Sequence, residues 1–160
     1  MTPLWFCSTA SLCVLCLVCL WKGVHRALPL YFWLQVAFAA LALLMIWAYF
    51  SPSISPREYE ELKWWKDRAT QAAEIAICTH MLDTRTEWSM RSIGIANGLY
   101  ALLKFAPYTV TDVPGEIDRT FYFLLQQWVN LAVILGSCIV ILLCKFTPEV
   151  QHENPIHQTP

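Results

Sequence analysis

Charged residues are scarce in this sequence and are missing altogether from three long stretches. They make up 14% of the 160 residues, whereas soluble domains carry about 25%. Pro3–Trp21, Leu28–Phe50 and Thr120–Cys144 contain no Asp, Glu, Lys or Arg. Each stretch is long enough to cross roughly 30 Å of hydrocarbon as a helix. The distribution of charge therefore predicts an integral membrane protein in contact with a lipid bilayer.

Other absences exclude whole classes of function. The chain has no basic cluster, and its formal net charge of -1 provides no positive field, so we expect no nucleic-acid partner. It also has no Gly-rich phosphate loop, His-Glu-x-x-His run or Gly-x-Ser-x-Gly elbow. A hydrolase built from Ser89 or Ser92 with His80 and Asp83 is the remaining catalytic arrangement, but residues this common lie near one another by chance. We predict a protein that is not an enzyme and uses no cofactor.

The first apolar stretch lacks the features of a signal peptide. Only Met-Thr precede Pro3, so there is no positively charged leading region. Lys22-Gly23-Val24-His25-Arg26 follow the stretch, where a cleavage site of small residues would be required. We interpret it as a retained membrane span.

Six of the seven cysteines lie in the first and last apolar stretches. Cys13, Cys16 and Cys19 are spaced like ligands of a metal or cluster. A thiolate is costly in hydrocarbon, however, whereas a thiol packs as a small apolar group. His80 follows Cys78 by two residues, but a zinc site would need two further ligands. The cysteines are therefore predicted to pack between helices, and we expect no metal site.

A polar segment between the second and last stretches predicts a helical hairpin. Ser55 and Glu58 have the spacing of a capping box at the start of one helix, and Thr84 and Glu87 have that spacing at the start of the next. We expect the second helix to end before Pro107. Its apolar part, 92–106, is shorter than the roughly 17 to 25 residues of a spanning helix. We therefore predict a half-inserted helix, with a full crossing as the alternative.

Seams of mostly small residues at helical spacing predict sites of close helix packing. They occur on the first hairpin helix, on the second hairpin helix in a Gly-x-x-x-Gly pattern, and on the last span in an Ala-x-x-x-Gly pattern. The residues are Leu62, Trp65, Ala69, Ala72 and Ala76; Gly94 and Gly98; and Ala132 and Gly136.

One face of the last span carries polar side chains within the predicted membrane. Gln126, Asn130 and Ser137 share this face, and Gln35 in the second span is a candidate partner. Interhelical hydrogen bonds are one interpretation, each contributing about half to two kcal/mol. A path for water, an ion or a solute is the other. Because the three spans contain no ionisable residue, we favour the packing role.

The predicted fold is an all-α polytopic membrane protein with three transmembrane helices, or four if the second hairpin helix crosses. Residues 1–50 form a transmembrane hairpin with spans 3–21 and 28–50, and 51–119 form the helical hairpin. Residues 120–145 form the last span, and 146–160 a flexible tail. The positions of Lys and Arg place the N-terminus and residues 51–91 on the cytoplasmic side, or on the equivalent side of an organelle membrane.

Three functions fit this sequence. We favour a component of a membrane complex that works by assembly with itself or with partner proteins. A holin-like pore former is the second, although 147–160 has no Lys or Arg where holins often have a basic tail. A small-solute channel or transporter formed by oligomerisation is the third, with Gln126, Asn130 and Ser137 lining the path.

Overall fold

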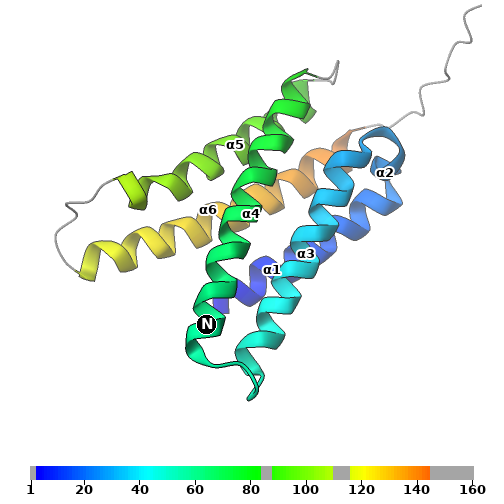
Figure 1. Ribbon diagram of the computed structural model, residues 1–160. Coiled ribbons are helices and arrows are strands. Elements are labelled where there is room, and N and C mark those ends of the chain that lie inside the picture. The colour runs from blue at the N-terminus through cyan, green and yellow to red at the C-terminus, as the bar shows by residue number, and fades with distance from the viewer. Residues whose placement is uncertain (1–2, 84–87, 110–115, 145–160) are drawn as a thin grey trace, which may run out of the picture.

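The computed structural model describes residues 3–83, 88–109 and 116–144, which form helices and short turns without a strand. Three helices are long and apolar enough to cross a membrane, which confirms the all-α membrane fold. The capping box at Thr84 and the tail at 146–160 lie outside the described residues. The elements are α1 (Pro3–Trp21), α2 (Val24–Ala27), α3 (Pro29–Phe50), α4 (Pro56–Asp83), α5 (Trp88–Thr109) and α6 (Glu116–Leu143) (Figure 1).

The turns follow the local sequence, with one addition. Gly23 takes a positive φ of 75°, which only glycine adopts readily, and it ends α1. The single-turn helix α2 follows it, within the short link between the first two spans. At the start of α4 the predicted capping box is confirmed. The Ser55 N–H donates to Glu58 Oε2 at 2.8 Å, and the Glu58 N–H donates to Ser55 Oγ at 3.3 Å.

The expected end of the second hairpin helix was wrong. α5 continues past Pro107 to Thr109. A proline removes its own backbone N–H and crowds the preceding turn. In α5 its cost is therefore limited to one backbone hydrogen bond and the crowding of one turn, and the helix continues for two more residues.

The five long helices form a closed ring. α1 packs against α3 and α6, α3 against α4, α4 against α5, and α5 against α6. The chain runs back and forth, so that the end of α6 returns to the α1–α3 turn, where Lys22 Nζ donates to the Cys144 carbonyl at 3.4 Å. In Figure 1 the end of α5 and the start of α6 lie well away from the α3–α4 turn. The ring is thus splayed at that end.

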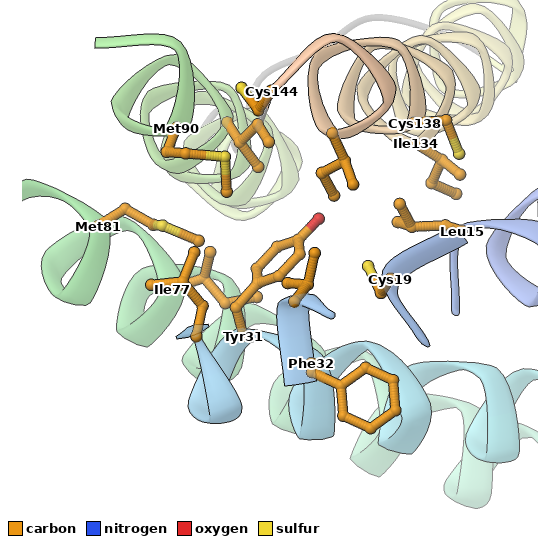
Figure 2. Close-up of a cluster of buried hydrophobic side chains, with 14 of the residues drawn as sticks. Leu15, Cys19, Tyr31, Phe32, Ile77, Met81, Met90, Ile134, Cys138 and Cys144 are labelled. Carbon is orange, nitrogen blue, oxygen red and sulfur yellow. The ribbon is translucent and has the colours of Figure 1, made fainter. Parts of the chain in front are cut away.

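The apolar core fills the opposite end of the ring. Tyr31 of α3 is 1% exposed and lies at its centre, with Leu15 of α1, Ile77 of α4 and Ile134 of α6 around it (Figure 2). Met81 and further buried residues of α4, α5 and α6 extend the cluster toward the Lys22 end. The predicted role of cysteine in packing fits here, because Cys19, Cys138 and Cys144 are buried in the cluster as free thiols.

Two glycines set the close contact between α4 and α5. A Cβ atom added to Gly94 would lie 2.5 Å from the Cβ of Met81. One added to Gly98 would lie 2.6 Å from the Sγ of Cys78. Real Cβ contacts are not this short, so the two helices approach at a distance that only glycine permits. The Gly-x-x-x-Gly pattern is therefore used within the chain.

Gly94→Ala should destabilise the protein by about 1 to 3 kcal/mol, because the clash is with an atom next to the α4 backbone. Gly98→Ala should cost less, since the Cys78 thiol can rotate away. Gly136→Ala is the matched control. No atom lies within 4 Å of its added Cβ, and alanine favours a helix by up to about 1 kcal/mol over glycine. Denaturant titration in detergent micelles measures all three, and equal stability of Gly94→Ala and Gly136→Ala would contradict the close contact.

Candidate functional site

A cavity of about 1120 Å³ lies inside the ring, next to the apolar core. All five long helices line it, and Leu12, Leu15 and Ile134 form the boundary that it shares with the core cluster. On α4, for example, the lining extends from Arg57 to Glu74, whereas the core residues Ile77 and Met81 follow. On α5 the order is reversed, with Met90 in the core before the lining begins at Asn97. The cavity is therefore closed at the core and extends toward the splayed end of the ring.

The polar face of α4 is turned toward this cavity. Thr70, Gln71 and Glu74 are buried, with exposures of 8%, 4% and 5%. Lys66 and Asp67 on the same face are half-buried. A helix on the surface of a soluble protein would bury its apolar side instead. This helix is inverted, because its polar side is buried toward the interior of the ring.

A buried ion pair joins α4 to α5 in the cavity wall. Lys104 Nζ lies 2.6 Å from Glu74 Oε1, and the two side chains are 14% and 6% exposed. Lys104 also donates to Thr70 Oγ1 at 3.4 Å, and its ammonium lies 4.4 Å from the ring centroid of Tyr100. Glu74 Oε2 is buried and accepts no hydrogen bond within the described residues. The pair thus keeps an acceptor without a donor, which is costly unless a water or solute donates to it.

The charges of the lining are balanced. Each of its charged side chains among the described residues belongs to an ion pair, and acidic and basic groups occur in equal number. The pairs are Arg57–Glu61, Lys63–Glu60, Lys66–Asp67 and Lys104–Glu74. The first two are exposed and contribute little to stability. The cavity therefore has no net charge to attract an ion of either sign.

Carboxamides supply most of the remaining polarity. Six line the cavity, from α3, α4, α5 and α6: Gln35, Gln71, Asn97, Gln126, Gln127 and Asn130. Ser137 also lines it, but its hydroxyl donates to the Val133 carbonyl of its own helix at 2.7 Å. In the part of the chain that the structure describes, no interhelical hydrogen bond joins Gln35 to the polar face of α6. Gln35 and the polar residues of α6 therefore line the same cavity, without hydrogen bonds to each other among the described residues.

The predicted packing seam of α4 lies on the outer side of the helix, away from the cavity. Leu62 and Trp65 are 41% and 67% exposed, Ala69 and Ala72 are exposed, and Ala76 is half-buried. On α6, Ala132 is exposed and Gly136 has no atom within 4 Å of an added Cβ. Of the predicted packing pairs, only Gly94 and Gly98 contact another helix of this chain at close range.

Sequence reasoning missed Glu74, Lys104, Gln71, Asn97 and Tyr100 as site residues. Glu74 lies on the side of its helix opposite the seam of Ala69, Ala72 and Ala76, and Lys104 lies within the apolar stretch 92–106. A usable signal was present. Once Gly94 and Gly98 are placed against α4 near Cys78, an antiparallel hairpin brings Lys104 opposite the turn that contains Glu74. Asn97, buried with its amide nitrogen on the Ile93 carbonyl at 2.8 Å, lies on the same inward face.

The described residues contain no cluster of His, Cys, Asp and Glu suited to a metal ion. Comparison with known proteins adds no assignment, because no family model, curated protein or solved structure matches the chain. The site is therefore interpreted from its own geometry.

Breaking the Glu74–Lys104 pair from one side should cost about 3 to 5 kcal/mol, because the remaining charge is left buried without a partner. Glu74→Gln and Lys104→Met are the single variants, and the double variant should recover most of the loss. The free energies of unfolding in detergent complete the double-mutant cycle. Losses that simply add in the double variant would contradict a direct interaction.

Proposed function

We propose that this protein carries a small polar solute without net charge across the membrane. The observation that supports this most directly is the cavity inside the ring, whose wall combines the Glu74–Lys104 pair with carboxamides. At about 1120 Å³ it is as large as the pockets that hold small molecules, typically about 300 to 1,000 Å³. This proposal develops the small-solute channel or transporter considered from the sequence, but places the path inside a single chain.

The chemistry of the wall supports a neutral or zwitterionic solute. Carboxamides donate and accept hydrogen bonds without carrying charge. Glu74 Oε2 is an acceptor in need of a donor, and the neighbouring Lys104 ammonium supplies donors of its own. A solute with both a donor and an acceptor satisfies the two together. A simple ion would instead bring a charge that no group of the balanced lining compensates.

The apolar core supports a carrier rather than an open pore. Tyr31, Leu15, Ile77 and Ile134 fill the ring between the cavity and the Lys22 end. A holin-like pore would require a continuous path past these side chains. In a carrier, the core separates the solute from one side of the membrane while the cavity opens toward the other.

Transport can be measured with proteoliposomes and two probes, glycerol as the neutral solute and glycine as the zwitterion. Stopped-flow light scattering after an osmotic step should show faster entry of at least one probe than into liposomes without protein. Asn130→Leu should reduce that rate, because it replaces a cavity carboxamide with an apolar side chain. Ile139→Ala, on the outer face of α6 at 58% exposure, should leave it unchanged.

Two results would contradict the proposal. One is entry of both probes at the rate of protein-free liposomes. The other is an Asn130→Leu variant that transports normally while the protein remains folded.

Assembly, the function favoured from the sequence, stays a second proposal. Its specific support is on α6, where Gly136 leaves open space beside the exposed Ala132. A helix of a second copy or of a partner protein can approach closely at such a position.

Native mass spectrometry in mild detergent tests this assembly. The wild type should form a dimer or larger complex, and Gly136→Leu should shift it to monomer without a loss of folding, because no other atom of the described residues lies within 4 Å of a Cβ added at that position. A wild-type protein that is strictly monomeric and without partners would count against it.

A further inference from the structure

The outward surface of α4 carries no charge over most of the helix. Between Trp64 and Leu82 the exposed side chains are aromatic, aliphatic or, at one position, a threonine: Trp64, Trp65, Ala69, Ala72, Ile75, Thr79 and Leu82. Every charged side chain in this range is buried or half-buried. At 1.5 Å per residue the range covers about 28 Å, which is close to the thickness of the hydrocarbon core of a bilayer.

The outward surface of α5 has the same character. Its exposed side chains among 88–104 are Trp88, Ser92, Ile95, Leu99 and Leu102. Asn97 and Lys104, its polar groups at mid-helix and beyond, face the cavity. From Trp88 to Thr109 the helix covers about 33 Å, which is also a spanning length.

We propose that α4 from Trp64 and α5 from Trp88 cross the hydrocarbon layer, with lipid acyl chains covering the outward faces of their described residues. The chain then crosses the membrane five times, in place of the half-inserted helix expected from the length of its apolar stretch. Hydropathy does not identify these two crossings, because an average taken around the whole helix includes the polar residues that face the cavity. The inference does not depend on what the cavity holds.

The neighbours of α4 and α5 support lipid as the occupant of these faces. α4 packs against α3 and α5 packs against α6, and both of these neighbours are apolar enough to span the membrane. The outward faces of α3 and α6 are apolar too, with Trp47 60%, Phe50 65% and Ile139 58% exposed. The uncharged surface is thus continuous around the ring. An apolar surface of this extent is not maintained in water.

Tryptophans mark both ends of the proposed crossings. Trp64 and Trp65 form an edge-to-face pair, with ring centroids 4.8 Å apart, at the start of the uncharged face of α4. Trp88, 77% exposed, lies at the opposite end, where α5 begins. Indole side chains concentrate at the two interfaces of a bilayer.

The end of α6 also fits this topology. Cys144 contacts Lys22 at the α1–α3 turn, whereas Ser51 lies at the other end of the spanning helix α3. The first helix begins on the Ser51 side of the membrane and α6 ends on the Lys22 side, so the chain crosses an odd number of times. Four crossings are therefore excluded by this geometry. Three and five crossings differ in whether the 84–87 link lies on the Ser51 side or on the Lys22 side.

The first experiment maps lipid contact on the unmodified protein. The chain is reconstituted in phosphatidylcholine vesicles that contain a phospholipid with a photoactivatable diazirine in its acyl chain, and labelled peptides are identified by mass spectrometry. Label should appear on Ala72 and Ile75 of α4 and on Leu99 of α5, as it does on α3 and α6. Gln71, on the inward face of α4, is the internal control and should carry none.

The second experiment tests sidedness with the full chain. A protease cleavage sequence is inserted either at Ser53 or within 84–87, and protease is added to one side of sealed vesicles. The two insertions should be cut from opposite sides of the membrane.

Cleavage of both insertions from the same side would overturn the proposal. So would label that is confined to α1, α3 and α6. A face of α4 that crosslinks to a second copy or to a partner protein, and takes up no lipid label, would also overturn it.

Discussion

The buried pair of Glu74 and Lys104 constrains the arrangement of the other helices. A carboxylate and an ammonium cannot be left separately in apolar surroundings, so α4 and α5 must hold them at contact distance, 2.6 Å between Nζ and Oε1. Both side chains also need a polar environment on the side away from the pair. The ring provides it, because α3 and α6 complete a wall of carboxamides around the space that the pair faces.

Two structural devices make this pairing possible. Gly94 and Gly98 bring α5 close to α4 near Cys78 and set the register that carries Lys104 to Glu74. The apolar core around Tyr31 then fixes the far end of the ring, where the five long helices meet. Close packing at one end allows the helices to diverge at the other. The cavity thus results from glycine contacts and the position of the core rather than from any single residue.

Most of the fold can be predicted from the sequence, but which side of α4 faces the interior cannot. The three charge-free stretches, the cap at Ser55 and the glycine contact of the hairpin follow from composition and spacing, which act locally. The burial of Glu74 does not, because a helical pattern shows that two faces differ without showing which one is inside. In water the seam of Ala69 and Ala72 would turn inward. Here it faces outward, while Thr70, Gln71 and Glu74 are buried.

The burial of the polar side of α4 also bears on whether the polar residues of the cavity serve helix packing or another function. If these polar residues served packing alone, their side chains would be expected to form hydrogen bonds between helices. Ser137 instead donates to a carbonyl of its own helix, and the amides of the described residues line the cavity. Glu74 Oε2 and Gln127 Oε1 are buried without a donor among the described residues, which lowers stability. A protein under selection for stability alone would replace such groups with apolar ones. Polar groups that cost stability and face a common cavity fit the proposed transport, in which a solute completes their hydrogen bonds.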